Sequence, residues 1–238
     1  MDNAIYASLT RQSGLMREMR VVANNIANAN TTGFRREGVI FAEHLSALDR
    51  QGNTLSMADA RGRMLDLNQG VLTQTNNNLD LAIEGDGFFM VETPDGVRLT
   101  RAGAFTPGPE GELMNADGNR LLDEGQAPII LPAGAGSVSI GADGTLSSNG
   151  LPFGRIGVFN PPEGETPAHQ GGTLFSTTGA PEPAESPRIR QGFLEDSNVD
   201  PIMEITRMIE VQRAYELGQS FLDREDQRIR SAITSMTR

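Results

Sequence analysis

Three acidic side chains close together in the middle of the chain are the residues most able to do chemistry. Asp80, Glu84 and Asp86 lie in one short stretch, and a pair of carboxylates at fixed separation is what a glycoside hydrolase uses as acid and base or nucleophile. The stretch is rich in turn-forming residues and lies in the acidic part of the chain, where carboxylates are usually solvated. An acidic hydrolase is therefore an alternative that requires turnover to be lost when a single one of these carboxylates is changed.

The other reactive side chains form no catalytic or metal-binding pattern. His44 and His169 are the only imidazoles, and both lie in expected loops without metal-ligand spacing around them. The sequence contains neither cysteine nor lysine, which excludes a thiolate nucleophile, a cysteine zinc site and a phosphate loop. Residues 115–118 lack the distal glutamate of a calcium loop and are expected to form a hairpin turn. We expect no enzyme activity, no cofactor, no metal and no small-molecule substrate.

The elements that organise the chain are at its two ends, and the clearer one is C-terminal. Apolar residues recur there every seven positions, at Met208, Tyr215, Leu222, Ile229 and Met236. The other half of the repeat falls at Ile205, Gln212, Gln219, Asp226 and Ile233. This spacing of three and four predicts a coiled-coil helix over residues 200–236. Its polar positions reduce stability, so we expect the helix to need a partner. Asp200 can cap it with Pro201 in the first turn, and Ser197 is an alternative cap.

The N-terminal residues repeat this pattern. A second heptad helix is predicted over residues 3–30, with seam positions Ile5, Leu9, Gln12, Met16, Met19, Ala23, Ile26 and Asn30. Its last turns contain Asn24, Asn25 and Asn28 among small residues. These asparagines either mark a frayed helix end stopped by Gly33 or let other helices approach closely while their amides bridge them. Matched seams at both ends suggest helices that pair with each other and with helices of neighbouring molecules.

The middle of the chain has a different period. From about residue 75, short apolar runs alternate with turn dipeptides such as Asp95-Gly96, Asp117-Gly118 and Asn149-Gly150, which predicts an antiparallel β-rich domain. The predicted fold is α+β, with the two terminal helices in an inner coiled-coil layer and the β domain outside. The predicted segments are an N-terminal helix (1–33), an extended connector (34–74), the β domain (75–187, whose last part from 161 is read as a surface loop), a return connector (188–199) and a C-terminal helix (200–238).

The distribution of charged residues along the chain limits the kinds of molecule that it can bind. Residues 71–187 carry four arginines and fifteen acids, whereas residues 1–70 carry eight and seven and residues 188–238 carry eight and nine. An acidic body argues against nucleic acid and anionic membranes as partners. No stretch has the 18 or so apolar residues of a transmembrane helix, so we expect no membrane insertion. The first residues do not have the pattern of a cleavable secretion signal.

Three blocks of sequence resemble one known family. They are residues 24–34; residues 74–76 followed by the run Leu-Asp-Leu-Ala-Ile-Glu-Gly-Asp-Gly-Phe-Phe at 79–89 and by residues 99–103; and residues 192–199 followed by residues 208–216. In order and spacing they resemble the axial proteins of the bacterial flagellum, in particular its basal-body rod proteins, and the opening residues resemble the proximal rod members. Thr32 and Pro201 depart from the usual pattern of that family without affecting the rest of the match.

The resemblance implies a structural subunit that assembles helically, with copies of itself and with other rod proteins, into the drive shaft that transmits motor torque. It also implies a place in the basal body, as rod within the periplasm, and export through the flagellar type III apparatus without signal cleavage. We expect the assembly interface to include Ile5, Leu9, Met16, Met19, Asn24, Asn25, Ile26, Asn28, Met208, Gln212, Tyr215, Leu222 and Ile229. Two alternatives stay open: a distal rod or hook subunit, and a free-standing secreted binding or adhesin module oligomerised by its helices.

Overall fold

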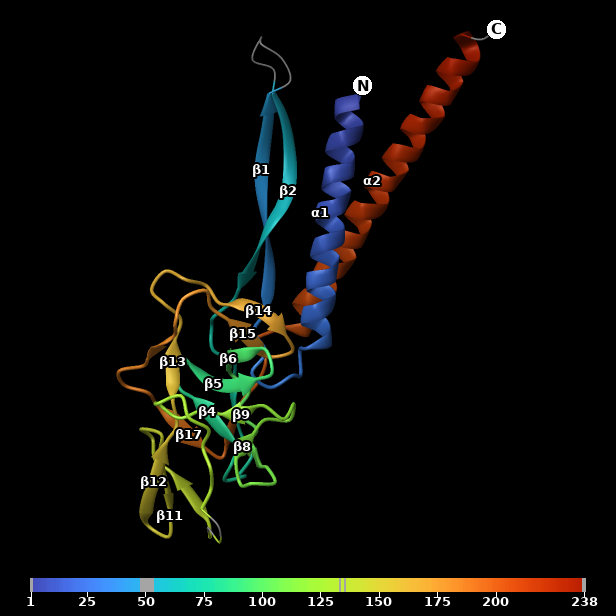
Figure 1. Cartoon of the computed structure of the whole chain (residues 1–238). Helices are drawn as coiled ribbons and strands as arrows, with labels where there is room; N and C mark the ends of the chain where they lie inside the picture. The colour runs from blue at the N-terminus through green and yellow to red at the C-terminus, as the bar shows by residue number, and fades with distance from the viewer. Residues whose placement is uncertain (1, 48–53, 133, 135, 237–238) are drawn as a thin grey trace. The chain divides into compact units, whose positions relative to one another are not determined.

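The fold consists of one helix at each end of the chain and a series of short strands between them (Figure 1). The computed structural model describes residues 2–47, 54–132, 134 and 136–236. The chain divides into two compact units. The helical unit comprises Met1–Ala27, Glu37–Met64 and Asp200–Arg238, and the β unit comprises Asn28–Arg36 and Leu65–Val199. The predicted α+β class, with a β-rich middle between terminal helices, is confirmed.

The helical unit contains both long helices and a hairpin. Helix α1 (Asp2–Ala27) packs against helix α2 (Pro201–Met236) and against strand β1 (Glu37–Ala47), which pairs with β2 (Thr54–Leu65). The sequence analysis read this hairpin region as an extended connector because its residues show no steady alternation. Its strands are 11 and 12 residues long. His44, predicted in a loop, lies in β1, and its side chain is outside the described part of the structure.

The start of α2 is fixed by a side-chain cap. The Asp200 Oδ1 atom accepts hydrogen bonds from the backbone N–H groups of Ile202 at 2.9 Å and Met203 at 3.2 Å. These are two of the four donors that a helix N-terminus leaves without an intrahelical partner. Pro201, which has no N–H to satisfy, occupies the first helical position. The predicted Asp200 cap is therefore confirmed over the Ser197 alternative.

Helix α1 ends earlier than predicted, at Ala27 instead of residue 30. A turn follows, in which the N–H of Thr31 donates to the carbonyl of Asn28 at 3.0 Å and the N–H of Phe34 donates to that of Thr31 at 3.1 Å. Gly33 closes the turn with a φ of +74°, a value that costs glycine little. Phe34 is then fully buried in the β unit.

The β unit is built from antiparallel strands, as predicted; every pair whose register is described in it is antiparallel. Its largest sheet runs in the order β14 (Ala168–Gly171), β15 (Leu174–Ser176), β6 (Gly96–Thr100), β5 (Phe88–Thr93), β9 (Arg120–Leu121), β8 (Leu113–Met114) and β7 (Thr106–Pro107), and β13 (Val158–Asn160) joins β5 to β16 (Glu182–Pro183). The smaller sheets are β10 (Val138–Ile140), β11 (Thr145–Ser148) and β12 (Leu151–Arg155); β4 (Leu81–Ile83) with β17 (Ile189–Gln191); and β3 (Leu72–Gln74) with β18 (Phe193–Glu195).

Glycines set the predicted turns. Gly96, Gly118 and Gly150 all have positive φ, at 103°, 82° and 79°. Asn149 also has a positive φ, of 52°, so Asn149-Gly150 forms the two-residue turn with both residues left-handed that joins β11 to β12.

The prediction of a surface loop over residues 161–187 was wrong in part. This segment contains β14, β15 and β16, and Phe175 of β15 is fully buried. The return segment 188–199 carries β17 and β18. These strands are only two to four residues long, so no local alternation reveals them. β14 pairs with its neighbour β15, whereas β15, β17 and β18 pair with the distant strands β6, β4 and β3. His169, predicted in a loop, lies in β14.

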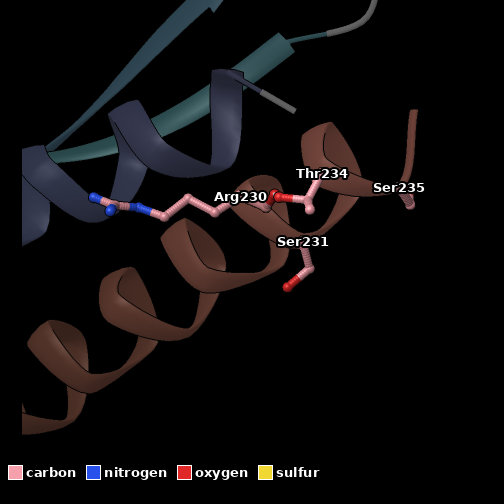
Figure 2. A pocket seen from close by; sticks show the side chains of 4 residues that line it. All are labelled: Arg230, Ser231, Thr234 and Ser235. Carbon is pink, nitrogen blue, oxygen red and sulfur yellow. The ribbon is translucent and has the colours of Figure 1, made fainter. Parts of the chain in front are cut away.

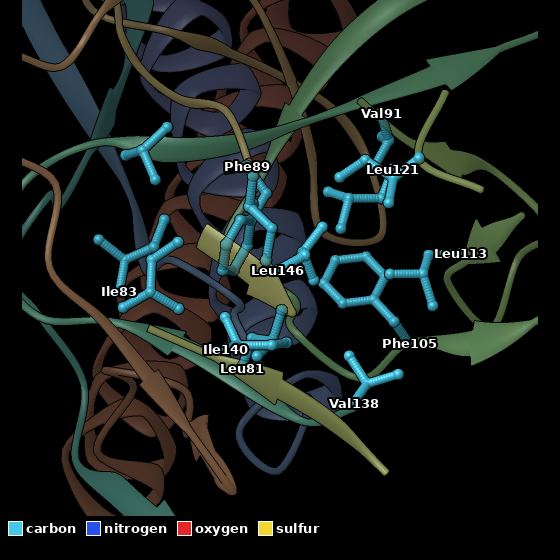
Figure 3. Close-up of a cluster of buried hydrophobic side chains, with 14 residues drawn as sticks. Leu81, Ile83, Phe89, Val91, Phe105, Leu113, Leu121, Val138, Ile140 and Leu146 are labelled. Atoms are coloured by element: carbon cyan, nitrogen blue, oxygen red, sulfur yellow. The ribbon is translucent and has the colours of Figure 1, made fainter. Parts of the chain in front are cut away.

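The core of the β unit has two clusters on the two faces of β5. Phe89 and Val91 belong to the larger cluster, where the rings of Phe89 and Phe105 meet edge to face with centroids 5.6 Å apart (Figure 3). Phe88 and Met90 belong to the smaller one. Since alternate side chains of a strand point to opposite faces, β5 is covered on both sides. This core makes the β unit a rigid body.

Candidate functional site

The two helices of the helical unit run antiparallel and are joined by polar contacts along their length. The Asn25 side chain donates to Glu204 Oε2 at 3.1 Å, Arg207 Nε donates to Glu18 Oε1 at 2.7 Å, and Gln12 Nε2 donates to the Tyr215 carbonyl at 3.2 Å. Successively earlier residues of α1 therefore meet later residues of α2. The two terminal helices therefore lie side by side, and polar side chains join them at these three points. A coiled coil formed by these helices stays a prediction.

The face of α2 that packs on α1 follows a strict heptad. Apart from Ala214, its buried or half-buried positions are spaced alternately by four and three residues; they are Glu204, Met208, Val211, Tyr215, Gly218, Leu222, Glu225 and Ile229. The predicted interface residues Met208, Tyr215, Leu222 and Ile229 lie on this face. The sequence analysis had therefore identified one half of the repeat as far as Ile229, whereas its last predicted position, Met236, is exposed.

The other predicted half of the repeat does not face α1. Ile205, Gln212, Gln219 and Asp226 are exposed, and the buried positions lie one residue earlier. The pattern of apolar residues was misleading here because the buried half includes two glutamates and a glycine, while an isoleucine lies outside. For the contact of α2 with its own α1 this half of the prediction was wrong. Gln212 as a contact between copies stays a prediction.

The predicted residues of α1 divide in a similar way. Gln12 is buried, and Met16, Met19, Asn24 and Ile26 are half-buried. Leu9 and Ala23 are exposed. The side chain of Ile5 lies outside the described residues, and Asn28 and Asn30 follow the helix end. The most buried side chains of α1 are instead those of Leu15, Glu18, Val21, Val22 and Asn25. Sequence reasoning missed Glu18 because a charged residue is not expected inside a helix pair.

Asn25 is the central residue of the helical unit, and it is completely buried. Its Nδ2 donates to the Glu37 carbonyl at 2.8 Å and to Glu204 Oε2, and its Oδ1 accepts from the Glu37 N–H at 3.0 Å. One side chain thus joins α1, β1 and α2. Of the two interpretations of the asparagine cluster, Asn25 follows the bridging one within this unit. Asn28, which lies in the β unit, accepts the Thr31 hydroxyl at 3.1 Å.

Replacing Asn25 by leucine is expected to destabilise the helical unit. The new side chain keeps the branched shape of asparagine but cannot form the hydrogen bonds with the Glu37 N–H and carbonyl, and losing them costs about 1–3 kcal/mol. Amide hydrogen exchange over residues 2–27 and 201–236, compared between the natural protein and the variant under conditions in which both helices are ordered, measures the change. Asn30→Leu is the matched control, because Asn30 is exposed in the same asparagine cluster. Equal effects of the two substitutions would contradict the bridging role of Asn25.

Glu18 and Arg207 form the charged contact of the helix pair. Glu18 is buried, whereas the Arg207 side chain is about half exposed. The hydrogen bond with Glu18 raises the pKa of Arg207 above its usual value. Because Arg207 also pairs with Glu210 of its own helix at 3.1 Å, the geometry of the guanidinium is fixed from both sides.

A second polar centre lies inside the β unit. Glu195 on β18 forms ion pairs with Arg35 at 2.7 Å and Arg101 at 3.0 Å, and all three side chains are almost completely buried. Glu195 Oε1 also accepts from the Gly70 N–H at 3.0 Å, and the Glu195 carbonyl accepts from the Gly33 N–H at 2.7 Å. Arg101 Nη2 donates to the Gly85 carbonyl at 2.6 Å. We call Arg35, Glu195 and Arg101 the buried triad.

Electrostatics make the buried triad a structural centre. Burial lowers the pKa of both Arg35 and Arg101, and the negative charge of Glu195 opposes that shift. The triad holds together chain segments that are far apart in the sequence: the turn after α1, the stretch before β3, the loop after β4, the residue after β6, and β18. Sequence reasoning missed it because the inward position of Glu195 follows only from its pairing with β3.

The candidates for chemistry are not arranged as a catalytic site. Asp80 is buried and its Oδ1 accepts from Asn77 at 2.9 Å, whereas Glu84 and Asp86 are exposed. His169 Nε2 lies 2.8 Å from the Gly172 carbonyl, and its ring packs on Phe34 and Phe175. Asn115 Oδ1 accepts from the N–H groups of Asp117 and Asn119, so this segment forms the hairpin turn that was predicted.

Two pockets are candidate ligand sites. One is formed only by exposed side chains near the end of α2, namely Arg230, Ser231, Thr234 and Ser235 (Figure 2), and Arg230 is paired with Asp226. The other is lined by residues of the β unit that include Arg101, Asp86 and Glu163. Arg101 already donates hydrogen bonds to Glu195 and to backbone carbonyls. Within residues 2–47, 54–132, 134 and 136–236, no three potential metal ligands cluster. None of the helices described is long and apolar enough to cross a membrane.

Comparison with known proteins gives matches along the chain. Residues 5–35 match the family model "Flagella basal body rod protein", residues 82–148 match "Flagellar hook protein FlgE/F/G D1 domain", and residues 190–235 match "Flagellar basal body rod FlgEFG protein C-terminal". These ranges cover most of α1, the centre of the β unit and nearly all of α2.

Individual relatives extend the match to nearly full length. The flagellar basal-body rod protein FlgF of Caulobacter vibrioides is 42% identical over 98% of this chain and 97% of its own. FlgF of Mesorhizobium japonicum is 40% identical over 91% and 90%, and the rod protein FlgG of Bacillus subtilis is 29% identical over 98% and 98%. With this identity across helices and β unit alike, the chain belongs to the FlgF family of flagellar basal-body rod proteins.

Proposed function

We propose that this chain is a structural subunit of the flagellar basal-body rod, in its proximal part, and that it assembles through α1 and α2. It would join copies of itself and other rod proteins in the helical shaft that transmits motor torque. The observation that carries the proposal is the pairing of both chain ends in one unit by the Asn25, Glu18 and Gln12 contacts. The names of the relatives, which are basal-body rod proteins, support it.

In the assembled rod, α1 and α2 would form an inner coiled-coil layer and the β-rich segment an outer one. The inner layer would take residues 1–33 and 200–238, the outer layer residues 75–187, and the segments 34–74 and 188–199 would connect them. The rod would lie in the periplasm, which the chain would reach through the flagellar type III apparatus without cleavage of a signal. A role without enzyme activity fits the dispersed carboxylates.

The helix pair has the composition of an interface that assembly completes. Its inner face includes Gln12, Glu18, Asn25 and Glu204, and burying polar groups contributes little net stability even when they are hydrogen-bonded. Long helices depend mainly on tertiary packing for their stability. The helices would therefore be loosely ordered in the exported subunit and become stable when neighbouring subunits cover them. Between the rod alternatives, the higher identity to FlgF at 42% than to FlgG at 29% favours the FlgF role.

Amide hydrogen exchange on the isolated chain tests this mechanism. We expect fast exchange over 2–27 and 201–236, slow exchange in β5 and its neighbours, and slow exchange of both helices in purified basal bodies. Strong protection of the helices in a monomer or a closed oligomer would contradict assembly-coupled folding. Absence of the chain from purified basal bodies, with normal motility of a deletion strain, would overturn the function itself.

A further inference from the structure

The outward side of α2 carries a second heptad stripe that no part of the helical unit covers. Its positions are Ile202, Ile205, Ile209, Gln212, Glu216, Gln219, Asp223 and Asp226, and all are exposed. The three isoleucines are 75%, 50% and 46% exposed. At about 100° per residue, the stripe lies roughly a third of a turn round the helix from the face that packs on α1. We call it the outer stripe of α2.

The spacing of the outer stripe indicates what covers it. Alternate steps of three and four residues are the pattern by which one helix packs along another. The stripe begins with three isoleucines, and its second half contains the acids Glu216, Asp223 and Asp226. Its partner should therefore be a helix that offers small or apolar residues at one end and a positive charge beyond them.

Helix α1 has such a face, directly opposite the side that packs on α2. Its exposed or half-exposed positions in heptad spacing are Leu9, Ser13, Met16, Arg20, Ala23 and Ala27. Ala23 and Ala27 are small enough to receive isoleucine side chains. The charged side chain of this stripe is Arg20.

Antiparallel docking brings the matching groups together. With Ala27 beside Ile205 and Ala23 beside Ile209, Arg20 lies near Gln212. Helical side chains tilt toward their own N-terminus, which in this orientation points Arg20 along α2 toward Glu216. The same chain cannot make this contact, because its own α1 already occupies another face of α2.

We infer that the outer stripe of α2 binds the outward face of α1 from a second copy of this chain, an inference that rests on the proposed rod function. The two surfaces are different, so the contact is heterologous. Each copy offers one stripe and accepts the other, which produces an open chain of subunits instead of a closed dimer.

Cysteine cross-linking in assembled rods tests the inference, because the natural sequence has no cysteine. The test chain carries Ala23→Cys and Ile209→Cys, is expressed as the sole copy in motile cells, and is treated with a short bismaleimide in purified basal bodies. The control chain carries Ala23→Cys and Leu217→Cys. Leu217 is exposed on another side of α2, so the control differs only in the face that bears the second thiol.

The expected result is a product of two and more linked copies with the test chain and loss of that product with the control chain. Unlinked test chain, equal linking in the control, or linking to a different rod protein would each overturn the inference. Presence of the natural chain in basal bodies purified from unmodified cells is measured independently. If the chain is absent there, the proposed rod function fails; if it is present without linking, only the stripe pairing fails.

Discussion

Replacing Glu195 by glutamine is expected to destabilise the β unit by about 3–5 kcal/mol, because the change leaves two buried guanidinium groups without their counter-charge. Arg35 and Arg101 have side chains that are only 1% and 3% exposed. Arginine does not escape the problem by deprotonating. Glutamine keeps the volume of glutamate, so the loss reports on charge and hydrogen bonding instead of a cavity.

The cost is high because the other acids that act on the two arginines, Asp66 on Arg35 and Asp86 on Arg101, have a smaller influence than Glu195. Buried nitrogens of both arginines, namely Arg35 Nε and Nη2 and Arg101 Nε, already have no hydrogen-bond partner. Burial lowers the pKa of both groups, and the carboxylate of Glu195 is the largest influence in the opposite direction. Removing that carboxylate leaves the full desolvation cost with little attraction to offset it.

The measurement is urea unfolding, monitored by the hydrogen exchange of backbone amides in β5, the strand that is covered on both faces. Glu92→Gln is the matched control: it removes the same charge from an ion pair with Arg120 at 2.8 Å, but these side chains are 40% and 47% exposed. An exposed pair contributes about 0–1 kcal/mol. Similar effects of Glu195→Gln and Glu92→Gln would show that burial does not determine the role of the buried triad.

The helix pair shows how far heptad reading can be taken. Heptad spacing predicted both helices and a common face for Met208, Tyr215, Leu222 and Ile229, which is the face toward α1. The Asp200 cap was also predicted. It chose Ile205 instead of Glu204 for the other half of the repeat, since an isoleucine is the more probable seam residue. Glu204 is buried between the helices because Asn25 donates a hydrogen bond to it at 3.1 Å. Predicting that burial would require knowing which residues of two distant segments meet.

The buried triad marks the limit of sequence reasoning in the β unit. The strands β4 to β6 were predicted from alternation and turns, because those signals are local. The segments that hold Arg35, Arg101 and Glu195 meet through contacts between residues far apart in the sequence, such as the β3–β18 pairing and the hydrogen bond from the Gly33 N–H to the Glu195 carbonyl. The three sequence blocks that resemble the rod proteins, which reach 24–34, 74–103 and 192–216, border or contain all three side chains. The family resemblance and the buried triad are therefore properties of the same part of the fold.

Gly33→Ala is expected to destabilise the β unit by about 3–5 kcal/mol, the sum of left-handed backbone strain and a backbone collision. A Cβ atom at Gly33, which has a φ of +74°, would lie 2.2 Å from the N atom and 2.7 Å from the Cα atom of Ala102. Neither atom can move aside like a flexible side chain. Ala102 adjoins Arg101, so displacing this segment also disturbs the buried triad.

Gly118→Ala separates the two causes of the Gly33→Ala effect. Gly118 has a similar φ of +82°, but a Cβ atom there has no neighbour within 4 Å. It should therefore cost only the strain of the left-handed conformation, about 1–2 kcal/mol. The difference between the two variants in the urea midpoint for β5 exchange gives the cost of the contact with Ala102. Equal midpoints would mean that the turn after α1 can move away from Ala102, and that it does not hold Arg35 in place against Glu195.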